Sequence, residues 1–415
     1  MRRFLTLFLT VSFISVAYTQ SYDEVSTGAQ YSQQAYYNLS TGSVQIVNNN
    51  AWDIAFSNIG QTDAGIFINE AASLAENPVK LFVALDNDWS TPITDASIFI
   101  DDVQLFNSEN NWTIGAFNET RNPDDPTDFG WGQYNPQNHQ IIGNEVYVVK
   151  KRNGDFIKFK VDAYRNGYYH FRYANLDNSN EVQDSVARNT NGPKSLVHYS
   201  FDSKGIVKID NGYDLVFTRY ITSLEDTPGH FINYSVTGFL LAPGTLAVVA
   251  DSVDVATVKE SDYSLAYSSA PTTIGHDWKS FNLTSGWQID EDRANFVKTK
   301  NGETYKLVFV DFSGSSSGTV TVERTKLATS KVNPDLQFPG MTLYPNPAQN
   351  VLYIDSDKPE PVRVSVINSL GRVVLEEATD TRSSITLPSD ITPGMYHIVV
   401  QGKERRSAFS IVISK

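Results

Sequence analysis

Short runs in which apolar and polar residues alternate recur along the chain, and clusters of Gly, Pro, Asn and Asp separate them. The segment Phe156–Val161 is typical, because its lysines and most of its apolar side chains would face opposite sides of a strand. A long period of 3.6 residues does not occur in the sequence. The pattern therefore predicts an all-β fold of many short strands joined by turns.

Three landmarks occur twice, in the same order, at offsets of roughly 147 to 162 residues. The paired segments are Tyr37–Ser57 with Tyr199–Thr218, Trp131–Asn135 with Trp278–Asn282, and Val148–Phe159 with Phe296–Leu307. Common residue types would not match by chance with such regular spacing. The repetition predicts that one supersecondary plan is used in two tandem β domains.

The last landmark predicts a hairpin in each repeat. Asn153-Gly154 and Asn301-Gly302 interrupt alternating runs, and Asn-Gly is the strongest short-range signal for a type I′ turn. A further strand follows each hairpin, at Tyr168–Tyr173 and at Gly318–Glu323. We expect the two turns to occupy equivalent positions in two superposable domains.

A third module follows at the C-terminal end of the sequence. It consists of β-branched runs between turn residues, and its recognisable positions are Pro345, Asn346, Pro347, Gly371, Gly394, Tyr396 and Lys415. Runs of this kind predict a small antiparallel, Ig-like β-sandwich.

The boundaries follow from composition. Arg2 and Arg3 precede the apolar run Phe4–Val16 and the small residues Ala17–Thr19, which is typical of a signal peptide that leaves Gln20 at the mature end. Asn, Ser, Asp, Gly and Pro crowd between residues 180 and 194, where we place the break between repeats. The predicted segments are a signal peptide (1–19), repeat 1 (20–180), repeat 2 (195–327), a linker (328–340) and the C-terminal module (341–415).

Charge and composition narrow the class of partner. The 415 residues carry a formal net charge of −14, which argues against nucleic acid or an anionic membrane as a partner. The absence of cysteine excludes disulfides, thiolate metal ligands and a lipidated cysteine. No segment after the signal approaches twenty apolar residues, so we expect an exported chain without a transmembrane anchor.

The order of the pieces from residue 341 to Lys415 resembles the C-terminal sorting domain, type A, of the type IX secretion system. This resemblance implies passage through the periplasm and the type IX machinery as a partner. It also implies a final location at the outer-membrane surface or outside the cell.

The strand Trp52–Phe56, the Gly130-Trp131 landmark and the hairpin Tyr147–Phe159 together resemble the HmuY family of secreted haem-binding proteins. The resemblance covers most of residues 30–176 and, more loosely, residues 195–327. It implies an all-β, hand-like structure that grips haem between loops.

The axial ligands of that family do not carry over. One family histidine follows the landmark tryptophan, and Pro136 and Leu283 stand at that position in the two repeats. Methionine ligands would have to come from Met341, where the linker meets the C-terminal module, or from Met395 inside that module. His139, three residues beyond Pro136, remains as the family-adjacent candidate for a haem ligand, and the alternative is an ordinary surface histidine.

Other chemistry is sparse. The loop Asn122–Asp128 has oxygen ligands suited to calcium, but it lacks the ligand rhythm of a helix-loop-helix site, and a solvated turn is the alternative. The sequence contains no nucleophile elbow, phosphate loop or paired-histidine zinc motif, so we predict no metal site and no catalytic constellation.

The sequence thus predicts a non-enzymatic, exported binding protein that captures haem for iron acquisition. The alternative is a surface adhesion module for a glycan or protein, which would use exposed tryptophans such as Trp112, Trp131, Trp278 and Trp287. A third interpretation, a hydrolase without a recognisable motif, has no residue pattern in its support.

Overall fold

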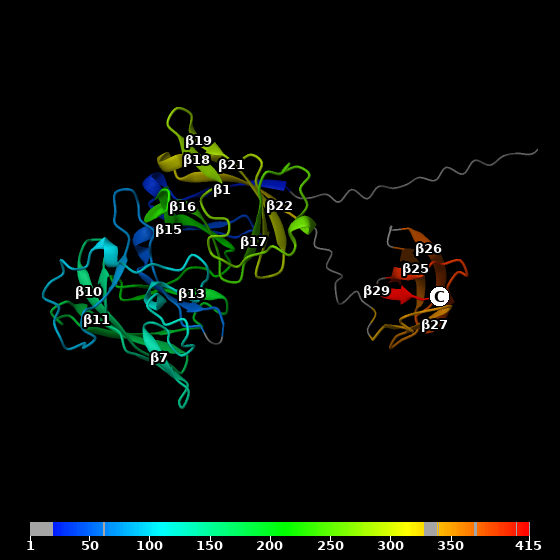
Figure 1. Cartoon of the computed structure of the whole chain (residues 1–415), viewed down its shortest axis with the longest axis horizontal. Helices are drawn as coiled ribbons and strands as arrows, with labels where there is room; N and C mark the ends of the chain where they lie inside the picture. Colours follow the sequence, from blue (N-terminus) through cyan, green and yellow to red (C-terminus); the bar gives the residue numbers. More distant parts are fainter. Residues whose placement is uncertain are drawn as a thin grey trace, which may run out of the picture. The chain divides into compact units, whose positions relative to one another are not determined.

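The computed structural model describes residues 20–60, 63–327, 338, 340–368, 372–403 and 405–414 (Figure 1). The described residues form two compact units, which divide the chain between residues 328 and 329. The predicted signal peptide, most of the predicted linker, Gly371 and Lys415 lie outside the described residues. Within the described part, the elements are β-strands and short 3-10 helices, which confirms the all-β prediction.

The larger unit consists of two lobes, each with its own hydrophobic core. Lobe 1 comprises residues 52–207, and its core contains Trp131 and Phe159. Lobe 2 comprises residues 20–48 together with 213–327, and its core contains Trp278 and Phe309. In each lobe an outer and an inner sheet contribute side chains to that core.

Lobe 1 contains strands β4 to β14. They are β4 (Ile54–Asn58), β5 (Ile66–Ile68), β6 (Lys80–Val83), β7 (Gly132–Asn135), β8 (Gln140–Gly143), β9 (Tyr147–Lys150), β10 (Phe156–Arg165), β11 (Tyr168–Asn175), β12 (Val182–Ala187), β13 (Ser195–Ser200) and β14 (Gly205–Val207). Its short helices are η3 (Asp101–Val103) and η4 (Ala116–Asn118).

Lobe 2 contains the three N-terminal strands and eight later ones. They are β1 (Gln20–Ser26), β2 (Gln33–Tyr37), β3 (Val44–Asn48), β15 (Leu215–Thr227), β16 (His230–Leu241), β17 (Leu246–Ala250), β18 (Lys279–Asn282), β19 (Gly286–Ile289), β20 (Ala294–Lys298), β21 (Thr304–Phe312) and β22 (Thr319–Lys326). Its short helices are η1 (Ala29–Tyr31), η5 (Glu260–Tyr263) and η6 (Gly314–Ser316), and η2 (Asn49–Ala51) leads into lobe 1.

The two lobes share one topology. The outer sheet has the order β12-β11-β10-β9-β6 in lobe 1 and β1-β22-β21-β20-β17 in lobe 2. The inner sheet has the order β14-β13-β4-β5 in lobe 1 and β3-β2-β15-β16 in lobe 2. Even the irregularities agree, because the register shifts after Val161 in β10 and after Phe309 in β21. The structure therefore contains the predicted repetition of one supersecondary plan.

The strands are exchanged between the repeats, however, and this corrects the predicted boundaries. β1 pairs with β22 along its whole length, and β2 pairs with β15 (Figure 1). Residues 20–48 thus complete lobe 2, although they precede all of lobe 1 in sequence. The predicted break at 180–194 contains β12, an edge strand of lobe 1, because turn-forming residues crowd at both of its ends.

Each lobe has one buried aspartate that holds the turn beside its inner sheet, and the two aspartates lie at equivalent positions. Asp53 accepts a hydrogen bond from Phe201 N at 2.7 Å, and Asp214 accepts one from Leu39 N at 2.9 Å. In both cases the acceptor lies just before an inner-sheet strand, and the donor lies in the turn that follows the neighbouring strand. Burial raises the pKa of Asp53 and raises that of Asp214 to about 6.

The predicted Asn-Gly hairpins join β9 to β10 and β20 to β21, at equivalent places, as expected. The predicted type I′ geometry is wrong. Gly154 and Gly302 have positive φ, whereas neither Asn153 nor Asn301 does. Gly154 N donates to Lys151 O, and Lys151 N donates to Asp155 O, which describes a longer turn with the glycine in the left-handed position. Only one residue per turn needs positive φ, and glycine supplies it.

The lobes meet through the outward faces of their inner sheets. Ile54 and Phe56 of β4 belong to the lobe 1 core, while Ala55 between them belongs to a separate apolar cluster at the seam. Val216 of β15 lies in that same cluster. Because alternate residues of a strand face opposite sides, the central strands of the inner sheets are buried on both faces, namely β4 and β13 in lobe 1 and β2 with the first part of β15 in lobe 2.

The C-terminal unit is a small sandwich, as predicted. One sheet has the order β23-β24-β27 and the other β26-β25-β28-β29. The bounds are β23 (Thr342–Tyr344), β24 (Val351–Asp355), β25 (Pro361–Asn368), β26 (Val373–Asp380), β27 (Ser383–Thr386), β28 (Gly394–Gln401) and β29 (Arg406–Ile413). Phe338, which we assigned to the linker, is buried in the core of this unit.

Candidate functional site

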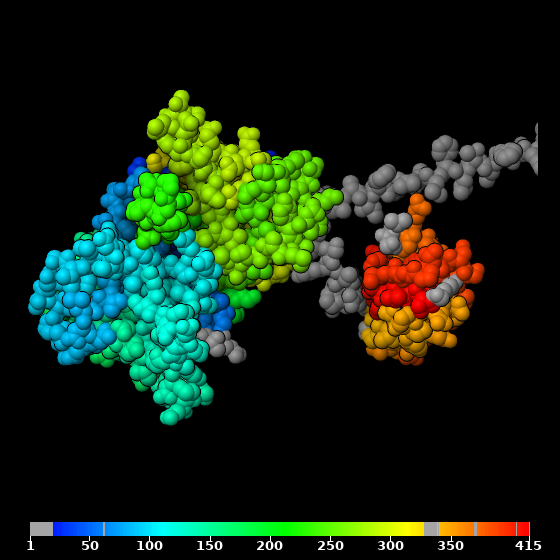
Figure 2. All heavy atoms as spheres, viewed as in Figure 1, coloured from blue at the N-terminus to red at the C-terminus, as the bar shows by residue number. Residues whose placement is uncertain are grey.

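A groove of about 740 Å³ opens on lobe 1 between the β7–β8 hairpin and the loop of residues 121–129. In Figure 1 this hairpin lies at the lower edge of the lobe, and in Figure 2 it projects from the surface. The residues that line the groove include Arg121, Phe129, Tyr134, His139, Ile141 and Tyr164, and also the aspartates Asp63, Asp125 and Asp128. The lining is thus mixed, with three aromatic rings of Phe and Tyr, one imidazole, one guanidinium and three carboxylates.

His139, the predicted ligand candidate, lies in this groove and is paired with a tyrosine. It occupies the β7–β8 turn with a positive φ of 57° and is exposed. The hydroxyl of Tyr134 lies 2.7 Å from His139 Nδ1. Tyr134 is half-buried and packs against the lobe 1 core. The short turn thus brings two possible iron donors into one hydrogen-bonded pair.

The loop wall of the groove is held by its own carboxylates. Asp125 accepts hydrogen bonds from the backbone and hydroxyl of Thr127, which lower the pKa of Asp125. Asp128 accepts from Asn122 N and from Gly130 N. Because these oxygens already bind backbone N–H groups, the solvated-turn interpretation of Asn122–Asp128 accounts for the acidic residues. Within the described ranges, no group of three or more His, Asp or Glu side chains is placed to hold a metal ion.

Tyr164 of β10 lines the groove as well, and sequence reasoning missed it. Its ring lies under the Arg188 guanidinium, 5.8 Å from ring centroid to Cζ, and Arg188 is paired with buried Asp63. Gly143 lets the hairpin reach this wall, because any Cβ at that position would collide with the carbonyl oxygen of Val161. The groove therefore owes its shape to a close approach of β8 to β10.

The equivalent space in lobe 2 is filled. Tyr134 and Ile141 are cross-strand partners in lobe 1, and Phe281 and Trp287 take the same places in the β18–β19 hairpin of lobe 2. The Trp287 ring lies 5.0 Å from the ring of Phe312, which stands where lobe 1 has Tyr164. Gly314, at a positive φ of 62°, leaves room for the Trp287 indole. In lobe 2, Trp287 thus fills the space that stays open in lobe 1.

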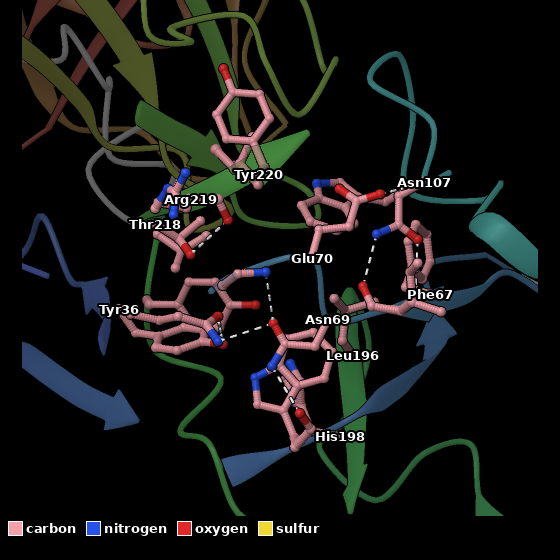
Figure 3. A pocket seen from close by; sticks show the side chains of 18 residues that line it. Tyr36, Phe67, Asn69, Glu70, Asn107, Leu196, His198, Thr218, Arg219 and Tyr220 are labelled. Atoms are coloured by element: carbon pink, nitrogen blue, oxygen red, sulfur yellow. Dashed lines mark hydrogen bonds between the residues drawn. The ribbon is translucent and has the colours of Figure 1, made fainter. Parts of the chain in front are cut away.

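A second hollow, of about 70 Å³, lies at the seam between the lobes (Figure 3). Glu70 binds both lobes there, since it accepts from Asn107 N at 2.9 Å and from Ile221 N at 3.3 Å. Burial raises the pKa of Glu70 to about 7. Arg219 reaches across in the other direction and donates to Ala72 O at 2.9 Å.

Two buried polar atoms at this seam hollow have no hydrogen-bond partner among the described residues, namely Trp52 Nε1 and His198 Nδ1. Burial lowers the pKa of His198 to about 3, so its imidazole is neutral. A volume of this size has room for a handful of water molecules, each of which needs roughly 10–15 Å³. The hollow is a polar gap in an interlobe core.

The tryptophans proposed for an adhesive surface are not available for it. Trp131 and Trp278 are fully buried in the two lobe cores, because the landmark places each at the foot of a hairpin. Trp112 and Trp287 are half-buried, and Trp112 donates to Leu241 O across the seam. The large exposed side chains on the lobe 2 hairpin are instead Phe281 and Leu283, which are 59% and 96% exposed.

The sorting-module residues that are described have structural roles. Asn346 accepts a hydrogen bond from Val412 N at 2.8 Å, between two prolines that both follow cis peptide bonds. Gly394 begins β28, and Tyr396 is buried in the core of the sandwich with its hydroxyl donating to Thr392 O. These positions close the edge of the sandwich on which the last strand lies.

The fold and the groove define a two-lobed all-β protein with a separate C-terminal sandwich. Residues 30–173 match the family model described as HmuY protein, and residues 342–414 match the model described as secretion system C-terminal sorting domain. The chain therefore carries a region of the HmuY family and a C-terminal sorting domain of the type IX system, as predicted. The HmuY match begins in η1 and ends in β11, so it includes strands of both lobes. No curated protein matches this chain.

The sorting domain confirms the predicted export. It directs the chain to the cell surface or to the outside of the cell, and it implies contact with the type IX secretion machinery. Among the described residues, no helix has the length and apolar character needed to cross a membrane.

Proposed function

We propose that this exported protein binds haem for iron acquisition, and that the groove of lobe 1 is the binding site. The groove is the observation that supports this proposal most strongly. It is large, three aromatic rings lie in its wall, and it contains the hydrogen-bonded pair Tyr134 and His139. The HmuY match, which includes the hairpin that carries this pair, supports the proposal.

The lining offers flat apolar surface and one cation to a ligand, beside three aspartates of which Asp63 pairs with Arg188 and Asp125 and Asp128 accept hydrogen bonds from their own loop. Its volume falls within the range of roughly 300–1,000 Å³ that is usual for small-molecule and cofactor sites. Phe129, Tyr134 and Tyr164 supply flat apolar surface, and Arg121 supplies an exposed guanidinium for a carboxylate. Haem, when bound, supplies an iron that accepts axial ligands from the protein.

The proposal places the hydrogen-bonded pair of Tyr134 and His139 at the iron side of the groove. The turn that carries His139 can shift more readily than a strand can change its faces, so His139 can belong to the site although it lies three residues beyond the family position. The hydroxyl of Tyr134 lies 2.7 Å from His139 Nδ1, so one of the two side chains can bind iron while the other orients it.

The experiment is a titration of the mature chain with hemin, followed in the Soret region. We expect a saturable change with one hemin per chain, and we expect His139→Ala to weaken it. His230→Ala is the matched control, because that histidine is also exposed but lies at the tip of the β15–β16 hairpin. No saturable change with the wild-type chain would refute the proposed function.

Adhesion to a glycan or protein remains the alternative, and one observation favours it. Phe281 and Leu283 are exposed on the projecting hairpin of lobe 2, where an apolar contact could form. A glycan array probed with the wild-type chain and with the Phe281→Ser variant would test this. Binding by the wild-type chain that the variant loses would support adhesion.

A further inference from the structure

We infer that the phenol oxygen of Tyr134, and not the ring of His139, is the atom in the lobe 1 groove that binds the iron, with His139 as its positioning partner. The inference rests on the proposed function and names the donor within that site. It departs from the histidine and methionine ligands that the family resemblance implies.

The first argument is burial. Tyr134 is half-buried in the groove wall and packs against the lobe 1 core, so its hydroxyl is held in place by the strand that carries it. His139 is exposed at the tip of the turn, in a left-handed backbone conformation. A donor that is fixed by packing keeps its geometry when a ligand arrives, whereas a donor on an exposed turn must be ordered first.

The second argument is the hydrogen bond. The hydroxyl of Tyr134 already points at His139 Nδ1 over 2.7 Å. When the phenol oxygen binds a ferric ion, its O–H bond breaks, its proton passes to His139 Nδ1, and its lone pair goes to the metal. Nothing is oxidised or reduced in this step. Tyrosine is an established axial ligand of haem iron.

The third argument comes from the other lobe. Lobe 2 has Phe281 where lobe 1 has Tyr134, and Phe312 where lobe 1 has Tyr164. Lobe 2 therefore has phenylalanine at two positions where lobe 1 has tyrosine. Neither hydroxyl is needed to build the scaffold, since the same strands and the same bulge form without them.

The rival arrangement has His139 on the iron and Tyr134 only as its support, and the two arrangements predict opposite results for single variants. The test uses hemin and, in parallel, metal-free protoporphyrin. Both are titrated into the wild-type chain and into the Tyr134→Phe, His139→Ala and Tyr164→Phe variants. Resonance Raman spectra of the hemin complexes report phenolate bound to iron.

We expect phenolate bands in the wild-type complex, in Tyr164→Phe and in His139→Ala. Loss of the positioning histidine should weaken hemin binding by about 10- to 100-fold, as is usual for a partner of a metal ligand. Tyr134→Phe should lose the phenolate bands and most of the hemin affinity. Its affinity for metal-free protoporphyrin should equal that of the wild type. Near-UV circular dichroism checks that each variant is folded.

Three results are decisive against the inference. The first is a wild-type complex without phenolate bands, the second is bands that survive Tyr134→Phe, and the third is bands that disappear in Tyr164→Phe. Each would overturn the assignment of Tyr134 as the iron donor. The proposed function would still stand in each case, because hemin would still bind. A wild-type chain that binds neither porphyrin would refute the proposed function itself.

Discussion

The two lobes of the larger unit use the same strands in the same order but differ in the space beside their projecting hairpins. Lobe 1 leaves a groove between Tyr134, Ile141 and Tyr164. Lobe 2 places Phe281, Trp287 and Phe312 at the equivalent positions and packs the three rings together. The scaffold therefore tolerates either an open or a filled groove, and a few side chains on β7, β8 and β10 decide which one forms.

What the lobes share is the set of contacts that builds the scaffold. Besides the aspartate pair, a lysine on the outer sheet fastens a long loop in each lobe. Lys158 Nζ donates to Trp89 O and Thr91 O at 2.7 and 3.0 Å, and Lys306 Nζ donates to Val255 O at 2.8 Å. Shared residues thus identify the fold, and the differing residues identify the candidate site.

The largest expected effect concerns the exchanged strands. A fragment of residues 195–327 should not fold, because it lacks β1, β2 and β3, which complete both sheets of lobe 2. A rearranged chain that joins residues 208–327 through a short Gly-Ser linker to residues 20–51 should fold as an isolated lobe 2. Circular dichroism and thermal melting of the fragment and of the rearranged chain check this. Cooperative unfolding of the first fragment would show that the exchanged strands are dispensable.

The next effect concerns Glu70, which joins the lobes. Its folded pKa, about 7, lies above its ordinary value of 4.5, so the folded state keeps the proton over that interval. The free energy of unfolding should therefore fall as the pH rises from about 4.5 to 7, by on the order of 3 kcal/mol from this group.

The Glu70→Gln variant should lose that part of the pH dependence, because it has no proton to release. Urea unfolding at pH 5, 6, 7 and 8 measures the slope, and Glu291→Gln is the control, since Glu291 is exposed. A slope in the Glu70→Gln variant that equals the wild-type slope would contradict the assignment.

The buried aspartates give an effect of comparable or smaller size. Asp53→Ala and Asp214→Ala each leave a backbone N–H without its acceptor, at Phe201 and Leu39 respectively. Each should lower the free energy of unfolding by about 1–3 kcal/mol. The asparagine variants keep an acceptor oxygen and should lose less. Denaturant unfolding measures all four, and equal losses for alanine and asparagine would speak against the hydrogen bond as the cause.

The smallest expected effect is the difference in stability loss between substitutions of the two lysines that hold loops. Lys158 is 1% exposed and makes two hydrogen bonds to loop carbonyls, whereas Lys306 makes one and is half-buried. Lys158→Met should therefore destabilise the protein by about 1 kcal/mol more than Lys306→Met, which is the usual net contribution of one hydrogen bond. Thermal melting of both variants gives the comparison, and a larger loss for Lys306→Met would contradict it.

Much of the scaffold was predictable from the sequence, because strands have a local signature. The alternation in Phe156–Val161 gave β10, and the recurring Asn-Gly gave two equivalent hairpins. The exchange of β1 was not predictable. Alternation shows that a segment is a strand, but it does not say whether the partner is nearby or, as for Gln20 and Thr325, about three hundred residues away.

The site was predictable in part. His139 was found because it follows a landmark tryptophan, and the structure places it in the groove. Tyr164 was missed because it lies on another strand, and only the pairing of β8 with β10 brings it to Ile141. The two repeats did contain a signal, since Tyr134, Ile141 and Tyr164 align with Phe281, Trp287 and Phe312. Differences within a repeat deserve the same scrutiny as its matches.

If the open groove of lobe 1 is the ligand site, placing there the side chain that lobe 2 carries at the equivalent position should abolish binding. Ile141→Trp should fill the groove as Trp287 fills lobe 2, and Ser280→Trp is a control for an added indole on an exposed face of the other hairpin. Hemin titration should show one site in the wild type and in the control, and loss of binding in Ile141→Trp at unchanged fold. Undiminished hemin binding by folded Ile141→Trp would show that the groove is not the ligand site.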